Sequence, residues 1–275
     1  MADGATLESA APVSPATRLA ILAAPFHCER GGKIDQPVLA YRTWGKLNSA
    51  RDNVILICHA LTGSADVDDW WPGLLGSGCP IDTDRWFVVC SNVLGGCYGS
   101  SGPYSRGQHG RRLGLDFPQV TIRDMVRAQQ QLLEQLGIER VHCVLGPSLG
   151  GMQAIEWTTS FSDRVSRQML IGSSARHSSW CIGISETQRA ALRADPNWRG
   201  GHYSDAEPPA QGLAAARMIA MVSYRSWQNF DQRFSRTTAD NGQFAVNSYL
   251  QYQGQKLVGR FDAASYHRLT EAMDS

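Results

Sequence analysis

The sequence predicts an α/β fold in which a mainly parallel β-sheet carries helices on both faces and a helical lid. Short apolar runs alternate with helical patterns through the first part of the chain. A Gly-x-Ser-x-Gly motif joins one of these runs directly to a helical pattern, and after about residue 178 helical patterns follow one another without a strand between them. Ligands of such a sheet bind at the carboxyl ends of its strands, so we expect a site there.

The strand predictions rest on the pattern of apolar residues. Residues 38–45 alternate apolar and polar side chains, as in an outer antiparallel strand. Residues 53–60 are almost continuously apolar and therefore need cover on both faces. Residues 85–91 predict a third strand, and residues 167–174 predict another buried strand. Between them, a helix capped by Thr121 is expected.

Helical patterns fill the second part of the chain. They cover residues 184–194, 212–224, 226–234 and 244–261, with proline-rich and glycine-rich loops between them. Helices placed over the carboxyl edge of an α/β sheet can serve as a lid. We therefore divide the chain into an α/β core, residues 1–177, and a helical lid region, residues 178–275.

Ser148 is the central residue of the Gly-x-Ser-x-Gly motif. An apolar strand ends just before it, and a helical pattern begins at Leu149. Glycines at 146 and 150 would let neighbouring segments approach closely enough for so sharp a turn. The turn would raise the hydroxyl above the sheet and direct the Leu149 amide toward a developing oxyanion. The motif is a weak signal alone, but this context indicates a nucleophile elbow.

Composition narrows the class of protein. The net charge of +1 gives no electrostatic reason to expect nucleic acid or an anionic membrane as partner. No apolar run approaches the length of about 18 residues that a membrane span needs, and the N-terminus lacks a signal sequence, which predicts a cytoplasmic protein. The seven cysteines show no metal-ligand spacing, so we expect reduced thiols and no metal site.

Five segments together resemble the homoserine O-acetyltransferase family. The resemblance runs from about residue 25 to the last residue and implies an α/β-hydrolase fold. It also implies transfer of the acetyl group of acetyl-CoA to L-homoserine, in methionine synthesis, with acetyl-CoA as co-substrate and no resident cofactor. The assembly implied for a complete member is a homodimer. The segments are His59–Ala65, Cys90–Gly99, Leu115–Val126, Val144–Gln153 and Ala216–Tyr224.

The resemblance also assigns residues. Ser148 matches the family's nucleophile, and the amides of Leu61 and Leu149 match its oxyanion hole. Arg217 matches the arginine that binds the substrate carboxylate, and Tyr224 follows it by about two helical turns, on the same side of a helix. Without the resemblance, a solvated Arg217 and a core Tyr224 are the simpler interpretations. The implied route is ping-pong, through an acetylated Ser148.

The histidines do not complete a triad. His59 precedes Ser148, whereas the base of this fold follows the serine, so we expect His59 to shape the Leu61 turn instead. The family's Asp and His lie after the lid, and neither His177, His202 nor His267 matches that position. The last residues still read as a helix. We therefore expect the C-terminal part of the core, with the triad Asp and His, to be missing, an edge of the sheet to be exposed, and the 275-residue chain to be inactive or impaired.

Three alternatives stay open. A succinyl-transferring or serine-directed relative would share the elbow and the sheet. A hydrolase would pass the acyl group to water, although a lid is suited to excluding water. A non-catalytic truncated remnant would bind substrate or a partner through its lid without turnover.

Overall fold

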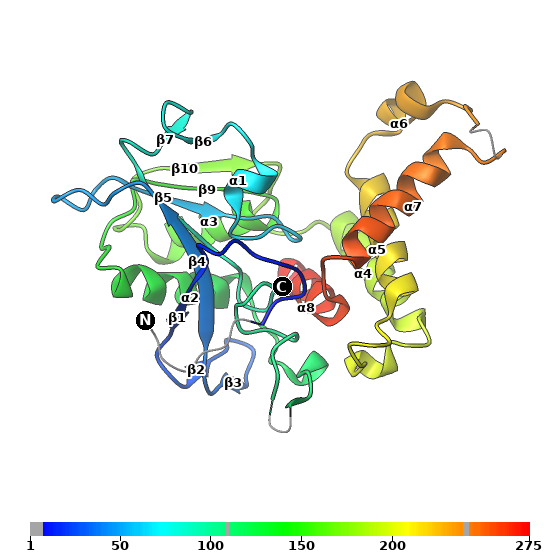
Figure 1. The fold of residues 1–275 in the computed structure, drawn as a ribbon, viewed down its shortest axis with the longest axis horizontal. Helices are drawn as coiled ribbons and strands as arrows, with labels where there is room; N and C mark the ends of the chain where they lie inside the picture. The colour runs from blue at the N-terminus through cyan, green and yellow to red at the C-terminus, as the bar shows by residue number, and fades with distance from the viewer. Residues whose placement is uncertain (1–7, 108–109, 239–241) are drawn as a thin grey trace.

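The computed structural model describes residues 8–107, 110–238 and 242–275. Its centre is a six-stranded sheet in the order β1-β4-β8-β5-β9-β10 (Figure 1). The strands β8, β5, β9 and β10 run parallel, while β4 is antiparallel to both β1 and β8. This confirms the mainly parallel sheet. The bounds are β1 Arg18–Ile21, β4 Val38–Trp44, β8 Phe87–Ser91, β5 Val54–Cys58, β9 Cys143–Pro147 and β10 Gln168–Ile171.

Strand β5 is buried along its whole length, as its continuous apolar pattern predicted. Leu56 joins the main core beneath helices α2 (Ile122–Gln135) and α3 (Leu149–Ser160). Ile57 faces a smaller cluster that includes Val67 of the short helix α1 (Val67–Trp70). Because other residues cover both faces of β5, a ligand can approach this strand at its carboxyl end.

Two expectations about strand position were wrong. Strand β4 is not the outer strand, because the four residues of β1 pair with it on one side and β8 pairs on the other. Strand β10 forms where expected, but it is exposed rather than buried, with Met169 54% exposed. It pairs with β9 alone among the described residues, so it is an edge of the described sheet.

Helices α2 and α3 pack against each other and hold the turn at Ser148 in place. Thr121 and Asp124 form a capping box at the start of α2, which confirms the expected cap. The Trp157 indole of α3 is fully buried and donates a hydrogen bond of 2.7 Å to Gln129 Oε1 of α2. Gln129 in turn donates to Gln153 Oε1 of α3 at 2.9 Å. This buried polar pairing holds α3, and with it the turn at its start, in one position.

The helices predicted after residue 178 are present. Figure 1 shows α5, α6 and α7 standing away from the sheet, whereas α8 returns to lie against the core. Ser265 at the start of α8 lies 3.4 Å from the carbonyl oxygen of Gly96 in the core. The bounds are α4 Ser179–Ala194, α5 Ala210–Ser223, α6 Trp227–Phe234, α7 Ala245–Val258 and α8 Ala263–Asp274.

The remaining elements are small. Strands β2 (Phe26–His27) and β3 (Lys33–Ile34) pair with each other, as do β6 (Leu75–Gly76) and β7 (Ile81–Asp82). All seven cysteines are free thiols, and burial raises the pKa of Cys58 to about 12. Within the described ranges, no helix combines the length and apolar character needed to cross a membrane.

Candidate active site

Ser148 lies in the turn between β9 and α3, where the sequence predicted it. Its backbone has φ 52° and ψ −121°, a conformation that residues with a side chain rarely adopt. Two bonds hold it: the Ser148 amide donates to the Ile171 carbonyl at 3.0 Å, and Ser173 Oγ donates to the Ser148 carbonyl at 2.7 Å. Strain maintained by its surroundings is typical of a reactive serine.

The two glycines of the motif let backbones come together. A Cβ on Gly150 would lie 1.9 Å from the carbonyl oxygen of Cys58, at the end of β5. A Cβ on Gly146 would lie 2.4 Å from the carbonyl carbon of Gly150. Helix α3 therefore begins directly against β5 and β9, and only glycine fits at these contacts.

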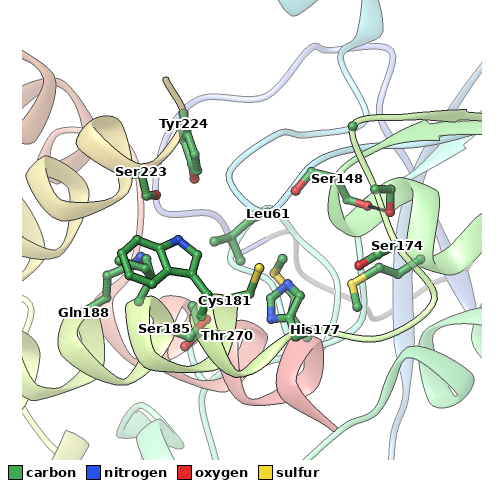
Figure 2. A pocket seen from close by; sticks show the side chains of 16 residues that line it. Leu61, Ser148, Ser174, His177, Cys181, Ser185, Gln188, Ser223, Tyr224 and Thr270 are labelled. Atoms are coloured by element: carbon green, nitrogen blue, oxygen red, sulfur yellow. Dashed lines mark hydrogen bonds between the residues drawn. The ribbon is translucent and has the colours of Figure 1, made fainter. Parts of the chain in front are cut away.

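Ser148 opens into a cavity of about 340 Å³ between the sheet and the helices of the second region. Figure 2 shows Ser148 and Leu61 approaching it from the core, with Tyr224 reaching toward it from the other side. A concave, partly apolar cavity with a few polar groups suits a small molecule. It is lined by Leu61, Ser148, Met152, Gly172, Ser173, Ser174, His177, Trp180, Cys181, Ile184, Ser185, Gln188, Ser223, Tyr224, Thr270 and Met273.

Both residues expected to form the oxyanion hole are near Ser148. Leu61 lines the same cavity, in the turn after β5. Leu149 is the first residue of α3, so its amide belongs to the first turn, whose N–H groups have no acceptor within the helix. Such amides stabilise a negative charge at a helix N-terminus. The role of the two amides stays a prediction.

His59 supports the turn that carries Leu61, as expected. Its Nδ1 lies 2.7 Å from the Ala60 carbonyl and donates to it, while the Val93 amide donates to Nε2 at 3.1 Å. Both ring nitrogens are thus occupied, and the side chain is buried. Burial lowers the pKa of His59 to about 4, so the ring stays neutral near pH 7.

The low pKa of His59 predicts a pH-dependent stability. The ordinary pKa of histidine is 6.5. Between about pH 6.5 and pH 4, His59 is therefore protonated in the unfolded chain but neutral in the folded one. The free energy of unfolding should fall as the pH drops through this window, by about 2 kcal/mol between pH 7.5 and pH 5. Urea unfolding of the parent and of His59→Gln measures it, since the variant should lose this part of the slope. Equal slopes would contradict the assignment.

Tyr224 and Arg217 lie together at the far side of the cavity. Tyr224 follows the last residue of α5 and lines the cavity. The Arg217 guanidinium carbon, two turns earlier on α5, lies 5.8 Å from the centre of the Tyr224 ring. Arg217 itself is not among the lining residues. The geometry brings Tyr224 into the cavity and a cation beside it, and the substrate-binding role of both stays a prediction.

The cavity also holds a histidine paired with an aspartate, which was not expected from the sequence. His177 lines it, and its Nδ1 lies 2.8 Å from Asp274 Oδ1, a residue 97 positions away. The other carboxylate oxygen of Asp274 lies 2.8 Å from Arg189 Nη1 of α4. An imidazole held through Nδ1 by a carboxylate presents Nε2 as its other polar atom. His177 follows the carboxyl end of β10, and this position in the sequence could have identified it as a candidate site residue.

The other two histidines after Ser148 lie elsewhere. His202 is half exposed, with Nε2 3.6 Å from Asp116 Oδ1. His267 is buried in α8, where its ring stacks on Trp198 with centroids 5.4 Å apart. Neither lines the cavity that holds Ser148.

Comparison with known proteins shows that the chain is similar to enzymes. Residues 53–263 match the family model described as alpha/beta hydrolase fold. The chain is 56% identical over 265 residues to the homoserine O-acetyltransferase of Trichormus variabilis, covering 96% of this chain and 74% of that protein. It is 54% identical to the enzyme of the same name from Chloroherpeton thalassium, covering 95% of this chain and 69% of that protein.

Solved structures agree on the fold. The homoserine O-acetyltransferase of Bacillus anthracis superposes with a TM-score of 0.85 at 27% identity, covering 94% of this chain and 75% of that one. Esterase E22 superposes with the same TM-score of 0.85 at 30% identity, covering 94% of this chain and 77% of that one. The chain is therefore similar both to acetyltransferases and to an esterase.

Proposed function

The chain belongs to the homoserine O-acetyltransferase family of the α/β-hydrolase fold, and we propose that it transfers the acetyl group of acetyl-CoA to the hydroxyl of L-homoserine, in methionine synthesis. The substrates of such an enzyme are small molecules. The observation that carries the proposal is that the strained Ser148 opens into the cavity shared with Leu61 and Tyr224. Acetyl-CoA enters as co-substrate, and the chemistry needs no resident cofactor.

The reaction follows a ping-pong route. Ser148 Oγ attacks the carbonyl carbon of the thioester, and the amides of Leu61 and Leu149 stabilise the oxyanion of the tetrahedral intermediate. The intermediate collapses with breakage of the carbon–sulfur bond, and CoA leaves as the thiol after its sulfur takes up the proton lost by the Ser148 hydroxyl. The hydroxyl of homoserine then attacks the acetyl-serine ester. The ester bond to Ser148 breaks, the proton of the homoserine hydroxyl passes to Ser148 Oγ, and O-acetylhomoserine leaves.

Arg217 binds the carboxylate of homoserine in this proposal. A guanidinium can form two parallel hydrogen bonds to a carboxylate, which would orient the acceptor hydroxyl toward the acetyl-serine. Tyr224 supports it, since its ring lies against the guanidinium and lines the cavity.

In a protein extended to the full length of the family, Arg217→Ala should weaken homoserine binding by about 2–4 kcal/mol, because a charge-assisted pair is lost. Acetylation of Ser148 by acetyl-CoA should be preserved. Steady-state kinetics for each substrate measure the two effects. The control is Arg193→Ala, which removes an exposed arginine of α4 paired with Glu186. An equal loss in acetylation and in homoserine use would show that Arg217 has another role.

Turnover by the 275-residue chain is a separate part of the proposal. These residues cover 74% of the length of the Trichormus variabilis enzyme. The resemblance implies a triad Asp and His after the lid, and we expect neither among the 275 residues. We expect impaired turnover, because a serine without a matched base loses several orders of magnitude in rate. Any residual proton transfer would depend on His177, since it lines the cavity and pairs with Asp274.

The test compares the 275-residue chain with a chimera that continues it with the last quarter of the Trichormus variabilis enzyme. Each is incubated with acetyl-CoA and L-homoserine, and O-acetylhomoserine is measured by mass spectrometry. The chimera should form product much faster. Equal rates would place a sufficient base within the 275 residues, with His177→Gln the variant to check. A chimera that prefers succinyl-CoA or L-serine would contradict the proposed substrates.

Ester hydrolysis is the second candidate, because esterase E22 is 30% identical with a TM-score of 0.85. Water would then replace homoserine as acceptor of the acetyl group. Release of free CoA with acetate, without O-acetylhomoserine, would favour it. Helices over the cavity favour transfer instead, since a transferase must keep water from its acetyl-serine.

For partners and location we propose a cytoplasmic homodimer with no nucleic acid or membrane partner. Trp227 of α6 and Tyr252 of α7 are 74% and 62% exposed on the part that stands away from the sheet. Large exposed apolar side chains of this kind favour contact with another chain. Light scattering coupled to size-exclusion chromatography measures the oligomeric state.

A further inference from the structure

The segment of residues 60–63, which we call the oxyanion loop, is held by two hydrogen bonds to the Ala60 carbonyl oxygen. The Gly63 amide donates to the Ala60 carbonyl at 2.8 Å, and His59 Nδ1 donates to the same oxygen at 2.7 Å. A peptide unit is planar, so the Ala60 carbonyl and the Leu61 amide point in opposite, fixed directions. Bonds to the Ala60 oxygen therefore orient the Leu61 amide.

A second peptide unit of the loop, between Thr62 and Gly63, is held from the helical region. Arg260, in the turn between α7 and α8, donates from Nη1 to the Thr62 carbonyl at 2.6 Å, and its Nη2 lies 3.4 Å from Thr62 Oγ1. The Thr62 carbonyl and the Gly63 amide belong to one planar unit. Arg260 thus fixes the peptide whose N–H binds the Ala60 oxygen. A cationic donor on Thr62 also polarises that peptide and strengthens the Gly63 bond.

Arg260 is itself well anchored. Its backbone carbonyl accepts a hydrogen bond of 2.7 Å from the Tyr98 hydroxyl, and its Nη1 lies 3.1 Å from the same hydroxyl. The Tyr98 ring packs edge-on against Phe261, with centroids 5.7 Å apart. The arginine comes from a position 198 residues beyond Thr62, so it joins the helical region to the oxyanion loop.

We propose that Arg260 is a positioning residue for the oxyanion hole, acting through Thr62, Gly63 and Ala60 to direct the Leu61 amide. The inference rests on the proposed function only in requiring that Ser148 forms a tetrahedral adduct beside Leu61. It applies whether homoserine or water accepts the acetyl group.

Arg260→Met removes the charged donors and keeps most of the apolar stem, while Arg260→Lys restores a single cationic donor. The matched control is Arg268→Met, because Arg268 also donates to a core carbonyl, that of Leu115, but away from the oxyanion loop. The probes are an alkyl trifluoromethyl ketone, which adds reversibly to a serine hydroxyl, and an acetyl-CoA analogue with a methylene group in place of sulfur, which binds without reacting.

The ketone adduct places a negative oxygen in the hole, whereas the analogue does not. Arg260→Met should weaken binding of the ketone by roughly 10–100-fold and leave the affinity for the analogue unchanged. A misdirected N–H group still stabilises the oxyanion in part, so the loss should be smaller than that caused by deleting the donor. Arg260→Lys should recover part of the ketone affinity, and Arg268→Met should change neither. If Arg260→Met does not fold, the Lys variant carries the test, with a smaller loss confined to the ketone.

An equal loss of affinity for both probes would show that Arg260 has only a structural role, and it would overturn the inference. So would an unchanged ketone affinity in both variants, or the absence of an adduct in the parent protein. Ketone binding that depends on Arg260 in the parent, together with a chimera that makes no O-acetylhomoserine, would overturn the proposed function and keep this inference.

Discussion

Ser148→Ala should abolish acetyl transfer, with a loss of about 10⁴–10⁶-fold relative to whatever rate the parent chimera shows. Without Oγ no acetyl-serine can form, and the oxyanion hole alone supplies only a residual acceleration. The fold should persist, because the bonds that hold this turn use the backbone amide and carbonyl of Ser148. Mass spectrometry of the protein after brief exposure to acetyl-CoA measures the acetylated form directly.

The control for this prediction is Ser160→Ala, which removes an exposed hydroxyl at the end of the same helix. It should leave acetylation unchanged. Acetylation at Ser148 is identified by peptide mapping of the parent. An acetylated Ser148→Ala protein with transfer activity near that of the parent would show that another residue is the nucleophile.

Gly150→Ala should destabilise the protein by about 3 kcal/mol or more. The added Cβ would lie 1.9 Å from the Cys58 carbonyl oxygen and 2.7 Å from its carbon, so backbone must move at the junction of β5 and α3. The same movement displaces Ser148, and the adduct with the trifluoromethyl ketone should be lost. Urea unfolding and ketone binding measure the two effects.

Gly183→Ala is the matched control, also a glycine-to-alanine change within a helix. A Cβ at Gly183 of α4 would meet nothing within 4 Å. Alanine favours a helix over glycine by up to about 1 kcal/mol, so this variant should be slightly more stable than the parent. A Gly150→Ala protein as stable as the Gly183→Ala protein would contradict the close approach.

Patterns that lie within a short stretch of sequence were predicted well. The apolar run of β5, the cap at Thr121 and the turn at Ser148 each depend on neighbours in the chain, and the structure contains all three. The same holds for the helices after residue 178, whose periodicity is local.

Features that depend on distant neighbours were not predictable. The burial of a strand depends on what pairs beside it, so β10 was expected to be buried although it pairs with β9 alone in the described residues. The contact of His177 with Asp274 and that of Arg260 with Thr62 join residues 97 and 198 positions apart. No periodicity marks such pairs, because tertiary packing creates them.

Strand β10 has a consequence for handling the 275-residue polypeptide. Its outer backbone N–H and C=O groups, together with Met169, Leu170 and Ile171, form a short apolar template to which another strand can add. The net charge of +1 supplies almost no electrostatic repulsion between molecules. Self-association should therefore grow with concentration and with added salts that strengthen apolar contact, such as sulfate. A lysine in place of Leu170 would act as a gatekeeper against intermolecular β-sheet.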